Sequence, residues 1–378
     1  MAIDERATLL AAQMNKEMGE GSVMVASEMH IPRRFTSGSL SLDLSIGGGW
    51  PGNQWVEIYG PENHGKTAIV LKTIAANQAL DSDFTTFWVA SEHYELDQAR
   101  ALGVDTDRVI VLSTRDMVDA YTGINRFLDE RATDCVVLDS YPALIPPDED
   151  SKGMDEYTQA EGARMTNKFF RKVGKAGLRN PKDPDDRPWF GMFVNQPREK
   201  IGGWAPNGGT PETTPGGRGK NFSFYCRLDV KRAEWIEEVS KSSKTKVGQV
   251  IRTRAIKNKG GPPQRVATMD FYFTDAESGF RRGQYDLAKD ALIPAVLFDV
   301  VHRSGAWYTY GDKRWQGLSN VLDDVRADDN LLAAIYKETY ERASSPRDKR
   351  TWDEDDIERA AAEPTVVRRR KPRVDPED

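Results

Sequence analysis

Short apolar runs rich in β-branched and aromatic residues alternate with helical stretches between Ser37 and Pro146. The apolar runs lie at Trp55–Tyr59, Thr86–Ala90, Val109–Leu112 and Cys135–Leu138. Helical stretches at Ala68–Ala79 and Asp119–Arg131 separate them. Strands that alternate with helices in this way form βαβ units. The pattern therefore predicts an α/β fold with a mostly parallel sheet flanked by helices.

The pattern continues with further strands and then changes to a smaller unit. The further strands are predicted at Trp189–Asn195, Arg227–Lys231 and Val250–Lys257. In the smaller unit, strands are predicted at Asp270–Phe273 and Trp307–Tyr310, and helices at Leu287–Val301 and Asn330–Arg342. We therefore expect a core domain over residues 36–269 and a small C-terminal α/β lobe over residues 270–343.

The two ends of the chain differ from both units. Residues 3–18 predict one amphipathic helix, within an N-terminal segment and linker of residues 1–35. This helix either packs within its own fold or docks on a neighbouring subunit. Residues 344–378 carry nine Lys or Arg and ten Asp or Glu among 35 residues, with few large apolar groups. Such a composition predicts a disordered tail.

Composition excludes several classes of protein. Two cysteines among 378 residues exclude a disulfide scaffold, and the four histidines show no zinc-ligand spacing. No apolar run approaches the length of a membrane span, so we expect no membrane segment and no signal peptide. The formal net charge of −6 argues against a globally basic nucleic-acid binder, although a local basic groove is compatible with it.

The strongest motif is a phosphate-binding loop. Residues 60–67 read GPENHGKT and match GxxxxGK[ST] between a predicted strand and a predicted helix. In such a loop, backbone N–H groups surround the phosphates and the helix N-terminus adds its positive dipole. Lys66 is then expected to reach the β- and γ-phosphates, and the Thr67 hydroxyl to coordinate Mg²⁺. The strand and helix on either side argue against a chance match.

Two later strands end in carboxylates that complete this chemistry. The strand at residues 135–138 is followed by Asp139, which is expected to hold the magnesium through water. The strand at residues 86–90 is followed by Ser91 and Glu92, and a glutamate there can orient or deprotonate the attacking water. The alternative for Glu92 is a solvated acid after a strand. Because parallel strands end at the same sheet edge, these groups should meet.

A Gly/Pro/Thr-rich stretch of about 25 residues follows the strand that ends at Asn195. Long loops without regular structure inside a domain are usually functional or disordered. Its basic residues could meet phosphates and Trp204 could stack on a base. Those basic residues are Arg198, Lys200, Arg218 and Lys220. Arg164 and Arg171 lie seven residues apart on one helix face, although charge on a helix face is usually only solvated.

The sequence resembles the bacterial RecA recombinase family from residue 2 to about residue 343. The motifs that carry the resemblance are AIDE, SGSLSLD, EIYGPENHGKT, SEH and LD within residues 91–97, VVLDS, NQPREKIG, PETTPGG, RLDVKR, KNK and GAWYTY. The phosphate-binding loop together with the NQ…KIG…PETT-GG loop is far more specific than a P-loop alone. The departures from the pattern suggest a divergent member, such as a bacteriophage-encoded copy.

The resemblance implies a fold, an activity and partners. The fold is a RecA-type P-loop ATPase core with an N-terminal polymerisation helix and a small C-terminal α/β lobe. The activity is ATP-dependent homologous pairing and strand exchange by a helical filament on single-stranded DNA, in DNA repair and the SOS response. ATP and Mg²⁺ are the implied cofactors. Single- and double-stranded DNA, other copies of the chain, single-strand-binding proteins and mediator proteins are the implied partners, in the bacterial cytoplasm.

The resemblance also implies roles for individual residues. The nucleotide-binding residues are Gly60, Pro61, Glu62, Asn63, His64, Gly65, Lys66, Thr67, Asp97, Asp139 and Ser140. The catalytic residues are Lys66, Glu92, Gln196, Lys257 and Lys259, with Gln196 sensing the γ-phosphate and the last two lysines reaching ATP on the adjacent subunit. The DNA-binding residues are Arg164, Arg171, Arg198, Lys200, Gly216, Gly217 and Arg218, with DNA loops at residues 148–157 and 196–217. Phe222 is the implied interface aromatic.

Three departures distinguish this chain from the family pattern. Where the family has a tyrosine that stacks on adenine, this chain has Gln98-Ala99-Arg100. The second DNA loop is about three residues longer. The tail is a charge mixture that includes the basic block Arg368–Arg373, whereas bacterial members usually have an acidic tail.

Two other functions remain as alternatives at this point. One is an ATP-switched DNA-binding scaffold or loader without strand exchange. The intact phosphate-binding loop and the candidate catalytic residues argue against it. The other is a hexameric helicase motor on the same fold, which the C-terminal lobe and the PETTPGG loop disfavour. A ring on DNA would indicate this motor, whereas a helical filament would indicate a recombinase.

Overall fold

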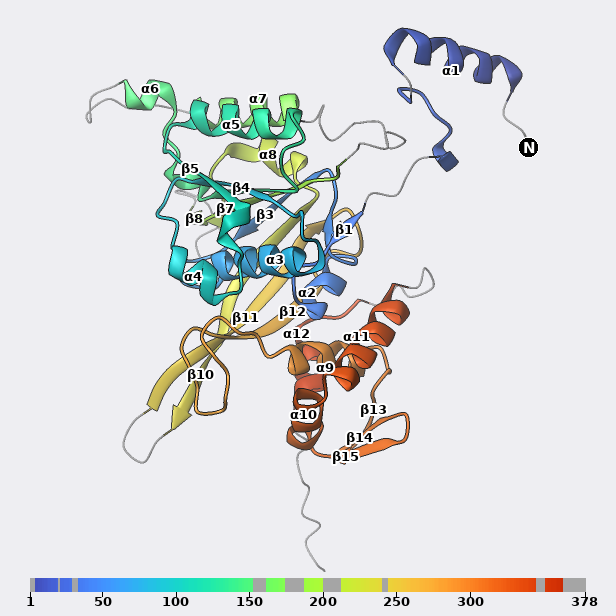
Figure 1. Cartoon of the computed structure of the whole chain (residues 1–378), viewed down its shortest axis with the longest axis vertical. Helices are drawn as coiled ribbons and strands as arrows, with labels where there is room; N and C mark the ends of the chain where they lie inside the picture. Colours follow the sequence, from blue (N-terminus) through green and yellow to red (C-terminus); the bar gives the residue numbers. More distant parts are fainter. Residues whose placement is uncertain are drawn as a thin grey trace, which may run out of the picture. The chain divides into compact units, whose positions relative to one another are not determined.

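The computed structural model divides into two compact units, Met1–Tyr285 and Asp286–Asp378 (Figure 1). The structure describes residues 4–19, 21–28, 33–151, 161–173, 187–199, 212–239, 244–344 and 351–362. Within these residues, every helix is too short or too polar to cross a membrane.

The first unit is built on one eight-stranded sheet in the order β12-β11-β10-β3-β7-β6-β4-β5. Its strands are β3 (Gln54–Tyr59), β4 (Thr86–Ala90), β5 (Val109–Ser113), β6 (Cys135–Asp139), β7 (Phe190–Asn195), β10 (Cys226–Val239), β11 (Lys244–Asn258) and β12 (Val266–Tyr272). The strands from β10 to β5 in this order pair in parallel, and β11 and β12 are added antiparallel. This confirms the predicted α/β fold with a mostly parallel sheet.

Helices cover both faces of the sheet, with α5 and α7 on one face and α3 and α4 on the other (Figure 1). The helices of this unit are α1 (Glu5–Met18), α2 (Leu40–Ser45), α3 (Lys66–Leu80), α4 (Leu96–Ala101), α5 (Met117–Asp129), α6 (Pro147–Asp150), α7 (Glu161–Val173) and α8 (Gly217–Ser223). Its short strands are β1 (Arg34–Phe35), β2 (Trp50–Pro51), β8 (Arg198–Glu199) and β9 (Glu212–Thr213), and its 3₁₀ turns are Ala26–Glu28, Thr106–Arg108 and Tyr141–Ala143.

Alternation along the strands produces two separate hydrophobic cores. In β6, Cys135 and Val137 pack into the core beneath α3, whereas Val136 and Leu138 pack into the core beneath α5 and α7. Successive side chains of a strand point to opposite faces, so a strand covered on both sides must be apolar throughout. This is why the central strands were visible in the sequence as continuous apolar runs.

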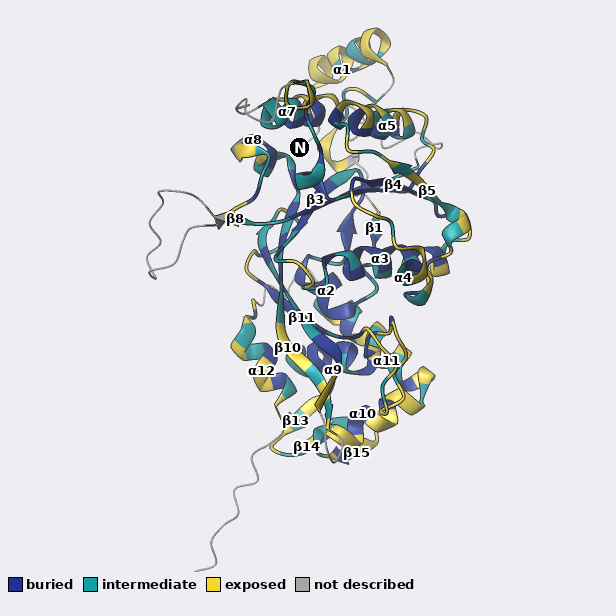
Figure 2. Cartoon of the chain, turned by 90° about the vertical axis from the view of Figure 1, so that its left-hand side faces the viewer, coloured by how far each residue is buried: buried dark blue, intermediate teal, exposed yellow. Residues whose placement is uncertain are grey.

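Helix α1 has no buried residue, and Leu9 and Leu10 are exposed (Figure 2). The helix itself was predicted correctly, and Asp4 caps it by accepting a hydrogen bond from the N–H of Arg6. Of the two alternatives for its apolar face, packing within the described part of this chain is not observed. Docking on a neighbouring copy stays a prediction.

The second unit contains a small antiparallel sheet and four helices. They are α9 (Leu287–Leu297), β13 (His302–Ser304), β14 (Trp307–Tyr310), β15 (Lys313–Gln316), α10 (Leu318–Ala327), α11 (Asp329–Ala343) and α12 (Glu354–Ala361). We expected this unit to begin at Asp270, but Asp270 lies within β12 and pairs with Val250 of β11. The strand belongs to the first unit because its apolar residues join the core of the large sheet.

The expectation of a disordered tail from residue 344 onward is wrong for residues 351–362. Trp352 is buried and packs edge to face on Phe298 of α9, with ring centroids 5.4 Å apart. Ile357 and Ala360 of α12 are also buried. Three well-spaced apolar residues are enough to anchor this segment, and the many charges around them hid that signal. Arg368–Arg373 lies outside the described residues.

Polar contacts hold both ends of α12. Asp353 caps the N-terminus: its carboxylate accepts a hydrogen bond of 3.1 Å from the N–H of Asp356, and its own N–H donates one of 3.1 Å to the Asp356 carboxylate. Arg303 donates to the carbonyl oxygens of Arg359, Ala360 and Ala362 at the other end. These carbonyls have no partner within a helix, and a guanidinium there also complements the helix dipole. The four consecutive acidic residues Asp353–Asp356 are therefore part of the C-terminal lobe.

We predict that Trp352→Ala destabilises the C-terminal lobe by about 3–5 kcal/mol, the usual cost of truncating a buried tryptophan. Urea unfolding followed by circular dichroism and by amide hydrogen exchange in α9 measures the loss. Trp307→Ala is the matched control, since Trp307 lies in the same unit and is exposed. Equal effects of the two substitutions would contradict the anchoring of α12.

Candidate functional site

The phosphate-binding loop joins the end of β3 to the start of α3, as the sequence predicted. Gly65 adopts a left-handed φ of 96°, and a Cβ there would lie 2.4 Å from Cδ1 of Ile251. A Cβ on Gly60 would lie 2.0 Å from the carbonyl oxygen of Val230. Both positions therefore require glycine, because the loop packs directly against β10 and β11. Lys66 and Thr67, in the first turn of α3, line the hollows on either side of the loop.

The loop is a positively charged environment. Burial and the charges of Arg232, Lys66 and Lys231 together hold the pKa of His64 below its usual range. Burial also lowers the pKa of Lys66, although Asp139, Glu92 and Glu62 oppose that effect. The ammonium of Lys66 donates a hydrogen bond of 2.7 Å to the carbonyl oxygen of Pro61. A carbonyl is a weaker partner for an ammonium than a phosphate oxygen, so the site favours an anion.

Thr67 and Asp139 meet across the sheet edge. The Thr67 hydroxyl donates a hydrogen bond of 3.0 Å to Oδ2 of Asp139. Burial raises the pKa of Asp139 to about 6; the charge of Glu92 adds to this, whereas the Thr67 hydrogen bond and Lys66 oppose it. A half-buried carboxylate beside a hydroxyl and a second acid is the donor set that a hard divalent cation takes.

The protein alone does not build a complete metal cage. Among the described residues, no group of three or more His, Cys, Asp or Glu side chains could hold a metal ion. Magnesium bound with a nucleotide usually takes only one or two protein ligands, and phosphates and waters supply the rest. The pair Thr67 and Asp139 fits that arrangement.

Glu92 lies beside this pair because the ends of β4 and β6 are tied together. Ala90 is the parallel partner of Asp139, and the N–H of Ser91 donates to the carbonyl oxygen of Asp139 over 3.1 Å. The Ser140 hydroxyl donates to Oε1 of Glu92. Glu92 is exposed, so it can reach a ligand while Ser140 fixes its carboxylate. The predicted meeting of the strand ends is therefore observed.

Residues that follow β7 line a hollow of about 540 Å³ together with the phosphate-binding loop. Gln196 and Arg198 line it together with Lys66, Thr67 and Glu92. Asn195, just before Gln196, accepts a hydrogen bond of 2.9 Å from the N–H of Gln196 through its own side chain. The candidate γ-phosphate sensor thus faces the phosphate-binding loop.

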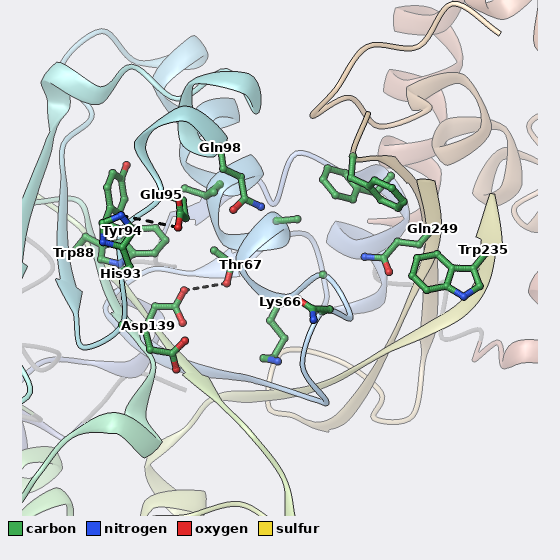
Figure 3. A pocket seen from close by; sticks show the side chains of 17 residues that line it. Lys66, Thr67, Trp88, His93, Tyr94, Glu95, Gln98, Asp139, Trp235 and Gln249 are labelled. Carbon is green, nitrogen blue, oxygen red and sulfur yellow. Dashed lines mark hydrogen bonds and ion pairs between the residues drawn. The ribbon is translucent and has the colours of Figure 1, made fainter. Parts of the chain in front are cut away.

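A larger pocket of about 570 Å³ opens on the other side of Lys66 and Thr67 (Figure 3). Glu95 and Gln98 line it from α4 and the turn before it, whereas Asp97, which was expected to bind nucleotide, does not line it. Sequence reasoning missed the part of the lining that comes from distant strands. These missed residues are Trp235, Gln249, Phe271 and Phe273. No local motif marks them, because they meet only when β10, β11 and β12 join the sheet.

Helix α7 presents its predicted basic face to solvent. Arg164 and Arg171 are exposed and line one hollow of about 530 Å³, together with Lys168. Phe169 and Phe170 on the opposite face are buried in the core. The arrangement agrees with the predicted spacing. Of the first DNA loop, residues 152–157 lie outside the described residues.

The predicted second DNA loop, residues 196–217, is described only at its two ends. Lys200 lies outside the described residues, and only the backbone of Arg218 is described. Gly216 and Gly217 carry positive φ angles at the start of α8, so the chain needs glycine there to turn into the helix. The returning strand β9 pairs with β8, which begins at Arg198. The loop therefore leaves and re-enters the fold at one short antiparallel ladder.

A buried ionic network anchors the returning end of this loop. Glu57 of β3 is fully buried and accepts hydrogen bonds from Lys220 Nζ, Arg227 Nε and Asn195 Nδ2, at 2.5, 2.5 and 2.9 Å. The hydroxyl of Thr214 accepts from both Lys220 and Arg227. The expectation that Lys220 meets phosphates is wrong, because its ammonium is buried against Glu57.

Lys257, Lys259 and Phe222 lie away from both nucleotide hollows of their own chain. Lys257 Nζ donates to the carbonyl oxygens of Asn221 and Phe222, at 2.6 and 3.2 Å. Burial and the charges of Lys259 and Arg227 lower the pKa of Lys257. Phe222 is exposed. These three residues therefore form a surface that could serve another copy of the chain.

Comparison with known proteins decides the family. Residues 6–278 match the family model described as the RecA N-terminal domain. The chain belongs to the RecA family. It is 35% identical over 307 residues to the protein RecA of Lactococcus lactis subsp. cremoris strain MG1363, covering 80% of this chain and 74% of that protein. It is 34% identical over 339 residues to the protein RecA of Saccharopolyspora erythraea, covering 88% and 91%.

Membership confirms the resemblance found in the sequence. A third relative, the protein RecA of Synechocystis sp., is 32% identical over 344 residues, covering 88% of this chain and 89% of that protein. RecA proteins are DNA-dependent ATPases that act as recombinases in DNA repair. This chain is likewise a DNA-dependent ATPase and recombinase. As a RecA family member it uses a nucleotide, binds DNA and forms filaments.

The charge balance of the buried network generates a prediction. Glu57 is the single negative charge against two cations, so Glu57→Gln leaves both cations uncompensated, whereas Lys220→Met leaves a balanced pair. We expect Glu57→Gln to cost about 3–5 kcal/mol of unfolding free energy, and Lys220→Met markedly less. Urea unfolding measures both, with the exposed pair partner Lys244 as a Lys244→Met control. The reverse order of the two losses would refute the charge argument.

Proposed function

We propose that this RecA family protein forms a helical filament on single-stranded DNA and uses ATP and Mg²⁺ to drive homologous pairing and strand exchange. One observation carries the proposal. Gln196 lines the hollow that contains Lys66 and Glu92, and it begins the second DNA loop. A change at the terminal phosphate would therefore act directly on a DNA-contacting segment.

The nucleotide phosphates would bind at the loop of residues 60–67. Lys66 would exchange the carbonyl oxygen of Pro61 for the β- and γ-phosphates, and the backbone N–H groups of residues 62–65 would surround them. Thr67 and, through water, Asp139 would hold Mg²⁺. When bound, the metal neutralises charge on the phosphates. Asp97 and Ser140 complete the proposed nucleotide-binding set, with Ser140 acting through Glu92.

Glu92 is proposed to orient the attacking water and take up its proton. The carboxylate accepts the Ser140 hydrogen bond, so one of its oxygens is held and the other is free to turn toward the hollow. A base in this role must lie within hydrogen-bond reach of the water. Gln196 on the facing strand end would contact the terminal phosphate from the other side.

DNA would be held mainly through its backbone, which suits binding without sequence preference. Arg164 and Arg171 on the exposed face of α7 would contact phosphates. The second loop would add Arg198, Lys200 and Arg218, with Gly216 and Gly217 allowing close approach of the backbone. Single-stranded DNA would bind first and duplex DNA second.

Neighbouring copies would complete each nucleotide site. Lys257 and Lys259 would reach the nucleotide bound by the next subunit, beside the exposed interface residue Phe222, and α1 would dock on that subunit. Single-strand-binding and mediator proteins are proposed as further partners. Family resemblance also supports a cytoplasmic location and a role in the SOS response.

The decisive experiment is a strand-exchange assay between circular single-stranded DNA and homologous linear duplex. Wild-type protein should form joint molecules with ATP and with a non-hydrolysable analogue. Lys66→Ala removes the side-chain cation of the phosphate-binding loop, so DNA-stimulated hydrolysis and ATP-dependent DNA binding should both fall by at least about 100-fold. Filaments without joint molecules would instead support the scaffold function, and rings would support the helicase motor.

Mixed filaments test catalysis across the subunit interface. The Lys257→Ala/Lys259→Ala variant should still bind ATP but lose DNA-stimulated hydrolysis. Mixing it with Lys66→Ala should restore part of the activity, because one class of mixed interface then carries a working lysine pair and a working phosphate-binding loop. Fluorescence energy transfer between labelled variants verifies mixing. Mixed filaments that remain inactive at every ratio would refute catalysis in trans.

A further inference from the structure

The structure leaves one wall of the 570 Å³ pocket without the aromatic ring that family resemblance implies. Where the family has its adenine-stacking tyrosine, α4 carries Gln98-Ala99-Arg100. Ala99 is fully buried, Arg100 is exposed, and of the three only Gln98 lines the pocket. Helix α4 itself therefore offers a planar base no ring, and the ring nearest to it in the lining, Tyr94 in the turn before α4, is half-buried and packs edge to face on Trp88 with centroids 5.1 Å apart.

The opposite wall of the same pocket does carry aromatic rings (Figure 3). Trp235 of β10 and Phe273, directly after β12, are 37% and 36% exposed. They are the two large hydrophobic side chains of this lining that are exposed to that extent, since Trp88, Leu71 and Phe271 are buried and Tyr94 is half-buried. Their rings meet at 86° with centroids 6.1 Å apart. Such a corner offers a planar purine one ring face and one ring edge.

Neighbouring cations hold the Trp235 ring in place. Arg232 Cζ lies 3.8 Å and Lys246 Nζ 4.3 Å from the ring centroid. Cation–π contacts of this kind fix an aromatic ring that is otherwise free to turn toward solvent. The ring is thus positioned in advance, and with both cations in place Trp235 is still 37% exposed and lines the pocket.

Gln249 supplies an unpartnered acceptor in the same pocket. It is the cross-strand partner of Trp235, is only 5% exposed, and lies beside Gly65 of the phosphate-binding loop. Its Oε1 is buried and accepts no hydrogen bond in the described structure. Burying an acceptor without a donor is costly, so such an atom points to a ligand that brings the donor.

We propose that Trp235 and Phe273 form the nucleobase subsite of this protein and that Gln249 accepts a hydrogen bond from the nucleoside. The donor is either a ribose hydroxyl or the exocyclic amine of adenine, both of which are N–H or O–H groups of the same ligand. The proposal rests on the proposed binding of a nucleotide at Lys66. It moves base recognition from α4, where the family pattern has its tyrosine, to the β10–β11 hairpin.

Binding of ATP and of inorganic tripolyphosphate, each with Mg²⁺ and measured by calorimetry on the full chain, tests the base subsite. Trp235→Ala should weaken ATP binding by about tenfold, the loss that removing one base–aromatic stack gives, and leave tripolyphosphate binding unchanged. Trp235→Phe should retain most of the affinity. Trp307→Ala is the matched control, since Trp307 is 38% exposed and also has an arginine over its ring, but lies in the C-terminal lobe.

These measurements test the base subsite at Trp235 separately from the phosphate site at Lys66. Equal weakening of ATP and tripolyphosphate by Trp235→Ala, or no weakening of either, would overturn the base subsite. Lys66→Ala should weaken both ligands. If Lys66→Ala left both ligands bound, the proposed phosphate site would fail, whatever the result at Trp235.

Nucleotide analogues identify the donor to Gln249. Gln249→Leu keeps the size of the side chain but removes the acceptor, so it should weaken ATP binding without unfolding the protein. If the ribose donates, wild-type protein should prefer ATP over dATP and Gln249→Leu should lose that preference. If the base amine donates, the same pattern should appear with inosine triphosphate. Unchanged ATP affinity in Gln249→Leu would refute the assigned hydrogen bond.

Discussion

The hydrogen bond between Thr67 and Asp139 joins the first turn of α3 to the end of β6, and the rest of the site depends on that meeting. It can form only if β3, which leads into the phosphate-binding loop, and β6 end at the same sheet edge. The sheet order places β7 between them and β4 beyond β6. The strand ends therefore bring four chemical groups together: Lys66, Asp139, Glu92 and Gln196. Parallel pairing creates this convergence, and the two apolar cores stabilise it.

The same strands connect the proposed nucleotide site to the proposed DNA loop by buried polar contacts. Glu57 lies in β3 three positions before Gly60, and Asn195 ends β7 just before Gln196. A hydrogen bond of 2.9 Å joins the two side chains, and Asn195 also donates to the carbonyl oxygen of Pro215 at the returning end of the loop. A displacement of Gln196 would therefore strain a network centred on the buried residues Glu57, Lys220 and Asn195. Such networks transmit small shifts because an unsatisfied buried charge is costly.

Local sequence patterns predicted the strands and the phosphate-binding loop, which depend on residues that are neighbours along the chain. The apolar runs located β3, β4, β6 and β7 to within a residue or so, and the GxxxxGK[ST] pattern located the phosphate-binding loop. The distal half of the β10–β11 hairpin was not predicted, because its exposed positions carry mostly charged residues and the apolar signal fades there. Trp352 was missed for a related reason, since its partner Phe298 is distant in sequence. The ionic partners of Lys220 were likewise invisible, so the residue resembled one more loop cation.

The β10–β11 hairpin unites two parts of the chemistry that the sequence kept apart. Near its base, Arg227 pairs with Lys257, and farther along the same ladder Trp235 pairs with Gln249. Eight residues of strand separate these pairs, a distance of about 26 Å. One ribbon thus carries the proposed base pocket for its own nucleotide and, at the other end, the lysine proposed to act on a neighbour's nucleotide. Because the two strands are hydrogen-bonded along this length, a filament would link successive nucleotide sites through continuous β-structure rather than through flexible loops.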